Sequence, residues 1–499
     1  MKKDTKVLYW IEEPFIDFGI AKHIQEKIGN KNYGIVICNN TTKKFFEEQN
    51  LVEFEKIWFY RNIISSKKQK VDMKYLKYLE NNLEIQLWRI VYGERFFTPF
   101  SKYHLFKREE ILSIIEQEAK LYEEILDEVK PDFLVMRLPD FHNIQLLYEI
   151  ARAKNVKIMM VAPSRLGGLT VTEEFDEKIE INNEKDLKVK NFDELKNQIK
   201  KYSNDHGVLM NRYRTSKMKK LIASIRFLFI NNKEFTNYYQ NKGKTKTAVI
   251  YKKILDSLRT YKTSKFIQAK LKKNIPENSS FIYFPLHVEP EQTLLIRAPY
   301  YTDQLNLIKN IAKSLPIEFK LFVKEHPAMK FNGWQSISFY KEIISLPNVE
   351  LFHPEISNEE FIEKCKLVIS IAGTAGLQAA FYQKPSIVLA DVNYTNLSSV
   401  YKLDKIEELG SVISKMVTKE VDILELNEYM NKLDAKSFNF ESMRFATDAY
   451  NIFGYGGFLA ESNVTLKKMN DFLSQNNEDF ELLSSEIIKK ITNFEKMYS

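Results

Sequence analysis

The sequence predicts an α/β protein built from two Rossmann-like domains with added helices. Three observations lead to this prediction. The chain has 499 residues, which is too many for a single hydrophobic core. Short apolar runs of strand length alternate with stretches of helical periodicity, as in parallel sheets covered by helices. A turn-rich segment at residues 275–280 divides the chain.

The second half of the chain has the cleaner alternation. Its expected strands cover residues 281–285, 318–323, 348–352, 367–370 and 386–389, and its expected helices cover residues 302–315, 337–345 and 375–383. A further helix is expected after Ser357, because Ser357 and Glu360 have the spacing of a capping box. This order predicts a doubly wound domain over residues 281–420.

The first half predicts a second Rossmann-like domain within residues 1–275. Its expected strands cover residues 7–11, 33–38, 56–60, 132–136 and 157–161, and its helices begin near residue 18 and cover residues 73–129 and 142–154. Residues 137–140 and 164–168 each follow a strand and could line a cleft, although plain turns are the favoured interpretation. Residues 421–499 are mainly helical and are expected to pack back on the N-terminal domain.

The net charge of +8 is unevenly distributed along the chain. Residues 207–276 contain eighteen Lys and Arg against two acids, a net +16, so the remainder of the chain carries −8. We expect a basic helical insertion at about 207–273, in which residues 221–230 have the pattern of an amphipathic helix. Such a block predicts an anionic partner, either a membrane leaflet, a lipid phosphate or a nucleic acid.

The N-terminus lacks the apolar core and cleavage site of a signal peptide. No window reaches the roughly 18 uninterrupted apolar residues that a membrane span requires. We therefore expect a cytoplasmic protein that attaches peripherally to the inner face of the cell membrane. Cys38 and Cys365 stand far apart and in no metal-binding motif, so we expect no zinc site.

Residues that suit a ligand follow four strands of the predicted second domain. They are residues 286–291, 324–327, 353–355 and 372–376, which are rich in charged, polar or glycine residues. Ligands of open α/β sheets bind at the carboxyl ends of the strands. A purely structural sheet would more often end in turn chemistry alone, so the sequence predicts a binding site at this edge.

Gly373 and Thr374 stand between a strand that ends at Ser370 and a helix. Glycine lets the backbone approach a ligand closely, and the free N–H groups at a helix start favour a phosphate. A tight turn with Thr374 as the N-cap is an equal alternative. Lys324 and His326 could donate to a diphosphate and stabilise a leaving nucleotide, whereas a surface lysine and a strand-capping histidine are the structural alternative.

Glu289 and Glu291 are two residues apart, so on an extended segment they share a face. One carboxylate facing the sheet crevice could deprotonate an acceptor hydroxyl or attack an anomeric carbon. A solvated acidic turn is the alternative. His353 and Glu355 give a weaker signal, because a plain turn before a capped helix explains them equally well.

Three of these segments together resemble a known family. They are FPLHVEPE at residues 284–291, FVKEHP at residues 322–327, and the stretch at residues 351–389. The set is similar to the capsule polysaccharide biosynthesis family, which includes bacterial β-Kdo transferases and resembles the CMP-sugar-using sialyltransferases. The resemblance implies a GT-B fold, with two Rossmann-like domains facing across a cleft. The donor would bind residues 281–420 and the acceptor residues 1–275.

The resemblance also implies roles for single residues. His326 of the His-Pro pair, with Lys324 and Pro327 beside it, would contact the donor phosphate, as would Gly373 and Thr374. The same nucleotide site would include Ser370, His353 and Glu355. Glu291 falls where the family has a catalytic aspartate, with Glu289 beside it. His287 in place of a glutamine, and glutamate in place of aspartate, leave the sugar and the stereochemical outcome open.

The predicted function is therefore a metal-independent glycosyltransferase of capsule or surface glycan biosynthesis. Its donor would be a nucleotide sugar, with a CMP-linked one such as CMP-Kdo favoured, its acceptor a lipid-linked glycan or polysaccharide, and no further cofactor would be needed. A GT-B-type sugar-nucleotide epimerase, a non-catalytic basic nucleic-acid or membrane-binding protein, and an inactive relative stay open as alternatives. Nucleic acid is the disfavoured partner, because the tyrosines of the basic block form no recognisable RNA-binding motif.

Overall fold

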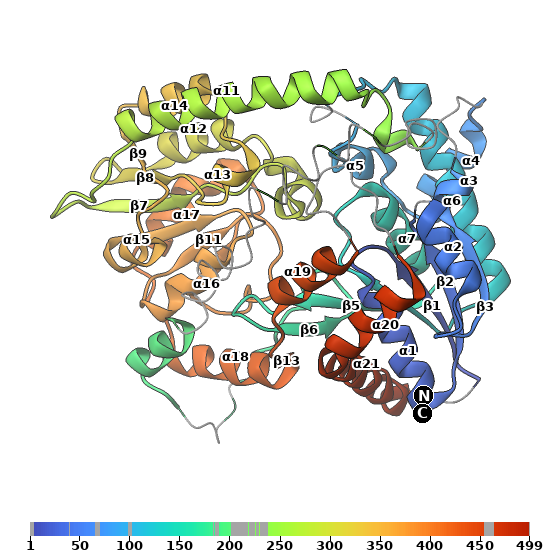
Figure 1. The fold of residues 1–499 in the computed structure, drawn as a ribbon. Helices are drawn as coiled ribbons and strands as arrows, with labels where there is room; N and C mark the ends of the chain where they lie inside the picture. Colours follow the sequence, from blue (N-terminus) through green and yellow to red (C-terminus); the bar gives the residue numbers. More distant parts are fainter. Residues whose placement is uncertain are drawn as a thin grey trace. The chain divides into compact units, whose positions relative to one another are not determined.

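The computed structural model describes residues 4–38, 40–64, 70–97, 102–182, 184, 189–200, 218, 225, 229, 238–453 and 464–498. The chain forms two compact units (Figure 1). Unit 1 comprises residues 1–175, 204–248 and 437–499, and unit 2 comprises residues 176–203 and 249–436. Each unit contains one sheet of mainly parallel strands covered by helices, so the predicted α/β class with two Rossmann-like parts is confirmed.

The sheet of unit 1 has the order β13-β6-β5-β4-β1-β2-β3. Its strands are β1 (Lys6–Ile11), β2 (Lys31–Val36), β3 (Phe54–Phe59), β4 (Phe133–Arg137), β5 (Lys157–Pro163), β6 (Leu169–Thr172) and β13 (Ser437–Phe438). The first five pair in parallel, and β6 and β13 extend the β5 edge antiparallel. The strand order reverses between β1 and β4, which is the switch point of a doubly wound sheet.

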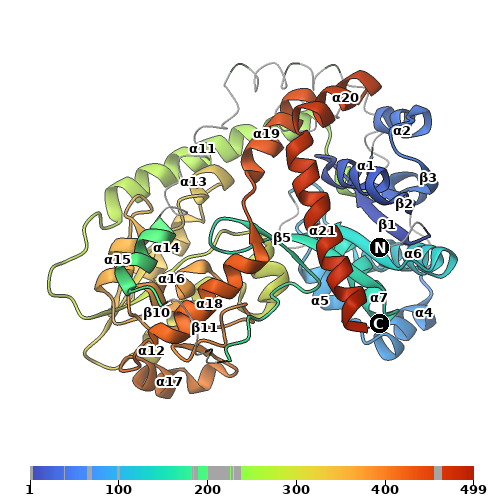
Figure 2. The same cartoon turned by 90° about the horizontal axis from the view of Figure 1, so that it is seen from below.

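Helices cover both faces of this sheet. They are α1 (Ile16–Ile28), α2 (Asn40–Glu48), α3 (Tyr60–Ile63), α4 (Met73–Asn82), α5 (Leu87–Tyr92), α6 (Arg108–Val129), α7 (His142–Ala153), η1 (Tyr239–Asn241), α19 (Ser442–Ile452), α20 (Leu466–Gln475) and α21 (Asn477–Tyr498). Alternate residues of β1 join opposite cores: Leu8 packs with α6 and α7, and Tyr9 packs with α1 and the C-terminal helices. Figure 2 shows α21 running along unit 1.

Gly19 of α1 permits the close packing of α21. A Cβ atom on Gly19 would lie 2.1 Å from Cε1 of Phe480, so no larger side chain fits there without movement. His23, one turn further on, is 3.1 Å from Oδ1 of Asn477 through its Nε2. The last helices are therefore part of the core of unit 1.

The sheet of unit 2 has the order β12-β11-β10-β7-β8-β9, and all its strands are parallel. Its strands are β7 (Phe281–Pro285), β8 (Lys320–Lys324), β9 (Val349–Phe352), β10 (Leu367–Ser370), β11 (Ser386–Val388) and β12 (Val400–Lys402). Every residue of β7 and β10 is buried, which explains why both strands are apolar apart from Ser370 at the end of β10.

The helical elements of unit 2 connect and cover these strands. They are α11 (Lys246–Lys270), η2 (Thr293–Arg297), η3 (Pro299–Tyr301), α12 (Gln304–Ser314), α13 (Met329–Asn332), α14 (Ile337–Ile344), α15 (Asn358–Lys364), α16 (Thr374–Phe381), η4 (Ile406–Glu408), α17 (Leu409–Met416) and α18 (Ile423–Lys436). Ser357 caps α15 by accepting from the backbone N–H groups of Glu359 and Glu360, at the helix start that the sequence predicts.

The chain passes between the units at other places than the sequence predicts. The expected boundary was residues 275–280, whereas the structure changes unit near residues 175, 203, 248 and 436. Most of α11 belongs to unit 2. The chain that leaves its C-terminal end forms a β-bridge between Lys272 and Phe352 of β9, which attaches this end to the sheet of unit 2. The amphipathic helix expected at residues 221–230 lies outside the described residues, apart from residues 225 and 229.

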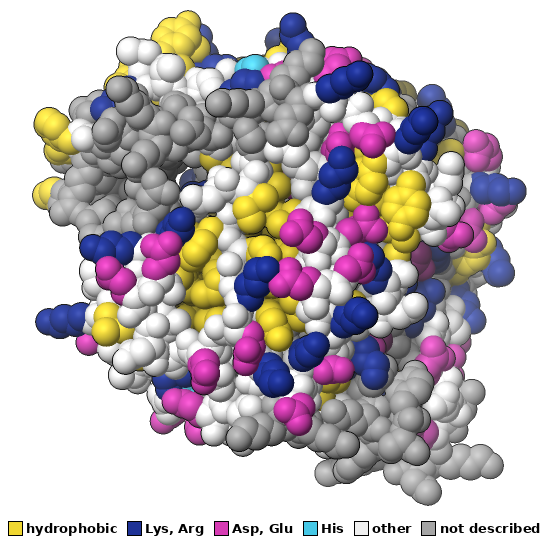
Figure 3. Space-filling model, turned by 90° about the vertical axis from the view of Figure 1, so that its right-hand side faces the viewer, with side chains coloured by type: hydrophobic (Ala, Val, Ile, Leu, Met, Phe, Trp, Pro, Cys, Tyr) yellow, Lys and Arg dark blue, Asp and Glu magenta, His cyan; other side chains and the backbone are white. Residues whose placement is uncertain are grey.

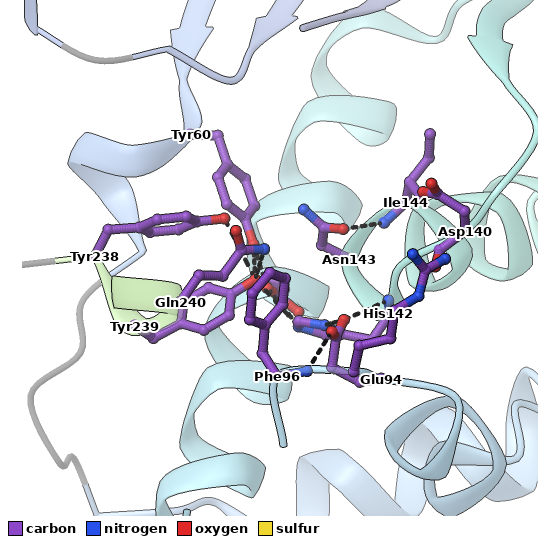
Figure 4. A network of polar contacts seen from close by, with 12 residues as sticks. Tyr60, Glu94, Phe96, Asp140, His142, Asn143, Ile144, Tyr238, Tyr239 and Gln240 are labelled. Atoms are coloured by element: carbon purple, nitrogen blue, oxygen red, sulfur yellow. Dashed lines mark hydrogen bonds and ion pairs between the residues drawn. The ribbon is translucent and has the colours of Figure 1, made fainter. Parts of the chain in front are cut away.

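A buried ionic network joins several elements of unit 1 (Figure 4). His142, at the start of α7, contacts Glu94 through Nδ1 and lies 3.1 Å from Oε1 of Glu118 through Nε2. All three side chains are fully buried. Tyr60 donates to Glu118, and the hydroxyl of Tyr239 is 3.4 Å from Nε2 of His142. The network therefore fastens α3, α6, α7 and η1 to one another.

The two carboxylates keep His142 protonated. Burial by itself would lower the pKa of the His142 imidazole, but Glu118 and Glu94 outweigh it and raise that pKa to about 10. Since the unfolded imidazole has a pKa near 6.5, the network contributes its full stability below about pH 6.5 and loses it as the pH rises toward 10. At neutral pH it stabilises unit 1.

We predict that His142→Ala destabilises unit 1 by about 3–5 kcal/mol, because removing one partner leaves two buried carboxylates uncompensated. Denaturant unfolding monitored by far-UV circular dichroism would measure the loss. The deficit should be largest near pH 6 and should shrink toward pH 10. His23→Ala is the matched control, since His23 is also buried but has a carbonyl, an amide and the Phe480 ring as partners instead of carboxylates. An equal, pH-independent loss in both variants would contradict the prediction.

Candidate functional site

The switch point of unit 2 lies between β7 and β10. Strands β8 and β9 follow β7 on one side, and β11 and β12 follow β10 on the other. The connections leaving β7 and β10 therefore diverge at the carboxyl edge and leave the crevice where doubly wound sheets bind ligands. The polar residues that the sequence places after four strands all lie along this edge, because the strands are parallel.

His287 and Gly373 meet at this switch point. Nε2 of His287, which follows β7, accepts from the backbone N–H of Ala372 at 3.4 Å. A Cβ atom on Gly373 would lie 3.0 Å from the same Nε2 and 2.9 Å from Oγ of Ser370. Only glycine fits there without movement, because the side chains of His287 and Ser370 occupy the space that a Cβ atom would need.

The loop after β10 is fixed by hydrogen bonds from three sides. Ser370 accepts from the backbone N–H of Gly373 at 3.1 Å, and the Tyr394 hydroxyl donates to the carbonyl of Gly373 at 2.6 Å. Gly373 is the N-cap of α16 in an extended conformation, and Thr374 is the first helical residue and exposed. Thr374 is thus not the N-cap that the turn interpretation required. The backbone N–H groups at the start of α16 are held in place at the crevice.

Glu289 lies half-buried beside His287. Gln335 donates to its carboxylate at 2.6 Å, and Gln304 holds the backbone of His287 by accepting from its N–H at 2.8 Å and donating to its carbonyl at 3.2 Å. Burial raises the pKa of Glu289, and hydrogen bonds from Gln304 and Gln335 partly oppose it. A carboxylate with a raised pKa in a crevice suits proton abstraction.

Glu291 has different surroundings from Glu289. The expected extended segment is wrong, because the chain bends at residues 289–290 and turns into helical structure from Gln292. Glu291 is exposed, and its carbonyl accepts from the N–H groups of Leu294 and Leu295. The two carboxylates therefore do not share one face of a strand.

Glu325 is a site residue that the sequence interpretation missed. It follows β8 between Lys324 and His326, and its side chain is 1% exposed. Tyr340 donates to its carboxylate, and the backbone N–H of His326 donates to it at 2.6 Å. Burial raises the pKa of Glu325 to about 7, although these two donors and Lys324 oppose the shift and Glu289 adds to it. Near neutral pH this carboxyl is therefore partly protonated.

The side chain of Lys324 is buried against α15 and does not face solvent. It is 3% exposed, and its ammonium group donates to Oδ1 of Asn358 at 2.5 Å. The Tyr283 hydroxyl donates to the same oxygen at 2.8 Å. Burial lowers the pKa of Lys324 to about 8, with Glu325 opposing the shift. Lys324 is therefore a buried charge rather than the surface lysine of the structural alternative.

His326 and Pro327 lie at the surface end of the same connection. His326 is partly exposed, and its Nδ1 accepts from the backbone N–H of Ala328 at 3.1 Å. This bond fixes the neutral tautomer with the proton on Nε2, so Nε2 is the ring atom that can donate to a ligand. Pro327 is exposed.

Both ring nitrogens of His353 contact other parts of unit 2, so the side chain has a structural role. Its Nε2 is 2.8 Å from Nε2 of Gln268 in α11, and its Nδ1 accepts from the N–H of Glu355 at 3.3 Å. His353 is 3% exposed, and Glu355 is exposed. The pair joins the end of α11 to the end of β9, which agrees with the structural alternative for these residues.

The two segments of unit 1 that could line a cleft form internal contacts. Arg137, at the end of β4, pairs with Glu12 after β1 and with Asp140 at 2.5 Å. Ser164 accepts from the N–H of Gly168 at 3.2 Å and closes a tight turn. Arg137 and Glu12 lie at the switch point of the unit 1 sheet, whereas the segment at residues 164–168 is the turn that the structural interpretation expects.

Among the described residues, the structure contains no group of three or more His, Cys, Asp or Glu side chains arranged to hold a metal ion. Within the same residues, no helix is both long enough and apolar enough to span a bilayer.

The central part of the chain matches a family model. Residues 195–397 match the family described as capsule polysaccharide biosynthesis protein. The family predicted from the motifs is thus confirmed for this part of the chain. The matched capsule-family segment contains all the site residues at the carboxyl edge of unit 2, from His287 to Tyr394. No curated protein matches the chain.

The solved structures that match the chain include two kinds of enzyme. A β-Kdo 2,7 transferase, KpsC of Thermosulfurimonas dismutans, is 13% identical over 69% of this chain and 87% of its own, with a TM-score of 0.30. A UDP-GlcNAc 2-epimerase from Neisseria meningitidis, bound to UDP-GlcNAc, is 13% identical over 86% of this chain and 99% of its own, with a TM-score of 0.23. At these TM-scores the likeness adds nothing to the site described above.

We predict that Glu325→Gln gains stability relative to the wild type as the pH rises from 4.5 to 7. The native carboxyl keeps its proton up to about pH 7, whereas the unfolded one loses it near 4.5, so the free energy of unfolding of the wild type falls across this range. Glutamine cannot titrate. The difference between the two proteins should change by on the order of 3 kcal/mol.

Urea unfolding at a series of pH values between 4.5 and 7.5 would measure this difference. Glu318→Gln is the control, because Glu318 is exposed in the same unit and should show no such trend. A constant difference between Glu325→Gln and the wild type at all pH values would show that Glu325 is not protonated in the native state.

Proposed function

We propose that the protein is a glycosyltransferase of capsule or surface glycan biosynthesis. Its donor is a nucleotide sugar, with a CMP-linked sugar such as CMP-Kdo favoured, and its acceptor is a lipid-linked glycan or a polysaccharide. One observation carries the proposal. His287, Glu289, His326 and Gly373 lie at the carboxyl edge of one parallel sheet, inside the capsule-family segment.

The donor phosphate would bind at the start of α16. The N–H groups there are positioned by Ser370 and Tyr394, and N–H groups at a helix start favour a phosphate. Nε2 of His326 would donate to the same phosphate, which would stabilise the negative charge that grows on the leaving nucleotide. These groups supply the neutralisation that a divalent ion provides elsewhere, so the proposed reaction is metal-independent.

Glu289 is the better placed of the two candidate carboxylates. It is half-buried beside His287, burial raises its pKa, and Gln335 orients it. As a general base it would take the proton of the acceptor hydroxyl while that oxygen attacks the anomeric carbon and the nucleotide departs with the bonding electron pair. Glu291, which is exposed, is the second candidate for this base.

We predict that Glu289→Gln lowers the rate of sugar transfer by about 100-fold or more, because general base catalysis contributes on the order of 10²–10⁴. The dissociation constant for the free nucleotide should stay close to that of the wild type. Glu291→Gln is the matched control, as it removes one charge two residues away. Transfer from CMP-Kdo and other nucleotide sugars to a capsule glycolipid acceptor would be measured. Loss of activity in Glu291→Gln alone would assign the base to Glu291.

We further predict that a cytidine nucleotide raises the melting temperature of the protein more than UDP or GDP does, since a ligand that binds only the native state stabilises it by mass action. His326→Ala should weaken nucleotide binding by about tenfold or more, the usual effect of losing a hydrogen bond to a charged group. His353→Ala should lower the melting temperature without ligand but keep the nucleotide-induced increase.

Two outcomes would contradict this proposal. An unchanged nucleotide affinity in His326→Ala would remove His326 from the phosphate site. Conversion of the donor alone into its epimer, with no transfer to any acceptor, would identify a sugar-nucleotide epimerase instead.

The same proposal places the protein in the cytoplasm, at the inner face of the cell membrane where a lipid-linked acceptor would be presented. The net +16 of residues 207–276 is the support that the sequence gives to this location, because Lys and Arg near an anionic leaflet each contribute on the order of 1 kcal/mol.

A further inference from the structure

Helix α11 exposes large apolar side chains to solvent along one side. Only Val249, Thr263 and Ile267 of this helix are buried. The exposed apolar residues, here called the α11 stripe, are Ile250 (43% exposed), Tyr251 (62%), Ile254 (56%), Leu255 (43%), Leu258 (54%) and Tyr261 (59%). Six such residues on one helix form a contiguous patch rather than scattered exposure, and such patches mark interaction sites.

The spacing of the α11 stripe places it opposite the buried residues. At about 100° per residue, the stripe covers roughly 140° of the helix, from Ile250 to Leu255, and the buried residues lie on the far side. The helix therefore has two apolar faces: a narrow one that packs on unit 2 and a wider one that faces away from it.

Cations surround the stripe. The helix carries six Lys and one Arg against a single acid, Asp256, which lies on the protein-facing side. By the same helical geometry, Lys252 and Arg259 flank the Leu255 edge of the stripe and Lys262 lies just inside that edge. The ammonium group of Lys265 lies 4.7 Å from the centre of the Tyr261 ring. By contrast, Lys and Arg are interspersed with Asp and Glu on the face drawn in Figure 3.

The helix is anchored at its C-terminal end. Trp334 donates to Oγ of Ser264 at 2.7 Å, and Gln268 contacts His353 at 2.8 Å. The Phe266 ring stacks with the Tyr340 ring at a centroid distance of 6.5 Å. These contacts lie beyond the stripe, so they hold the helix to unit 2 without covering the apolar face. In Figure 1, α11 lies at the margin of this unit beside α14.

We propose that the α11 stripe and its flanking cations dock on an anionic lipid surface. The apolar side chains would enter the boundary between headgroups and acyl chains, and the Lys and Arg side chains would remain with the lipid phosphates. This inference deepens the proposed function, since it names the surface from which a lipid-linked acceptor would be reached. It localises the membrane contact to one face of α11, whereas the net charge of residues 207–276 does not indicate which surface makes the contact.

The chemistry of the stripe favours a lipid surface over a nucleic acid. Four of its six residues are Ile or Leu, which bury in hydrocarbon but offer no ring on which a base can stack. Lysine predominates over arginine among the cations, whereas bidentate phosphate and base contacts favour arginine. A single-stranded RNA is therefore the rival that the experiment must test.

The experiment is co-sedimentation of the full chain with vesicles made of phosphatidylglycerol and phosphatidylcholine in equal parts, at physiological salt. We expect the wild type to sediment with these vesicles and to stay in solution with pure phosphatidylcholine. Ile254→Ser with Leu258→Ser should lower the partition coefficient by about tenfold or more, because each substitution removes an apolar side chain from the bilayer boundary. Lys262→Glu with Lys265→Glu should lower it by a similar factor.

Two control variants are matched to these changes. Ile317→Ser removes an apolar side chain that is fully exposed in unit 2 but outside the stripe, and Lys405→Glu reverses an exposed charge elsewhere in the unit. Both should sediment like the wild type. Circular dichroism of every variant would confirm that the fold is retained.

Equal sedimentation of the stripe and control variants would overturn the proposal. It would also be overturned if the wild type bound neutral vesicles as strongly as it binds anionic ones. A salt-sensitive gel shift with single-stranded RNA, without vesicle binding, would overturn it in favour of the rival. Vesicle binding needs no donor, so its failure is separate from a failure of transfer. If both proposals hold, the stripe variants keep full transfer to a water-soluble acceptor and lose it with an acceptor embedded in vesicles.

Discussion

The parallel pairing of β7 with β10 is the constraint on which the candidate site depends. The register sets Leu367 beside Ile282 and Val368 beside Tyr283, so both strands end at the same edge with their connections running apart. His287 and Gly373 then come within contact distance, although they are far apart in the chain. Gln304 holds the backbone of His287, and Ser370 and Tyr394 hold the backbone of Gly373, so this pair is fixed from both sides.

The two units bury charge in opposite ways. In unit 1, His142 lies between two carboxylates, so the buried charges compensate one another and the result is a rigid junction of helices. In unit 2, Glu325 is buried with a phenol and a backbone N–H but no paired cation, because the ammonium group of Lys324 is directed to Asn358. The first arrangement stabilises the fold, and the second keeps a carboxyl close to its titration point beside the site.

The sequence predicted strand β7 with its observed bounds, because a strand buried on both faces is apolar throughout. It also placed Gly373 and His326 correctly at strand ends, since parallel topology puts all carboxyl ends at one edge. It could not identify Glu325, whose burial depends on Tyr340 of α14, or the structural role of His353, which depends on Gln268 of α11. Such contacts between distant residues leave no local pattern. The domain boundary was misplaced for the same reason, as α11 looks like a linker but packs on unit 2.

The packing of α21 against α1 also sets an order for biosynthesis. Unit 2 ends at residue 436, whereas the core of unit 1 includes Phe472, Phe480 and Ile487. A ribosome therefore delivers every residue of the second unit before it delivers α19, α20 and α21, which complete the hydrophobic core around α1. Unit 1 therefore cannot complete its core before unit 2 has been synthesised, although domains generally fold in order from the N-terminus. During translation, the face of α1 around Gly19 stays uncovered until the final helices emerge, and a chaperone would find its binding surface there.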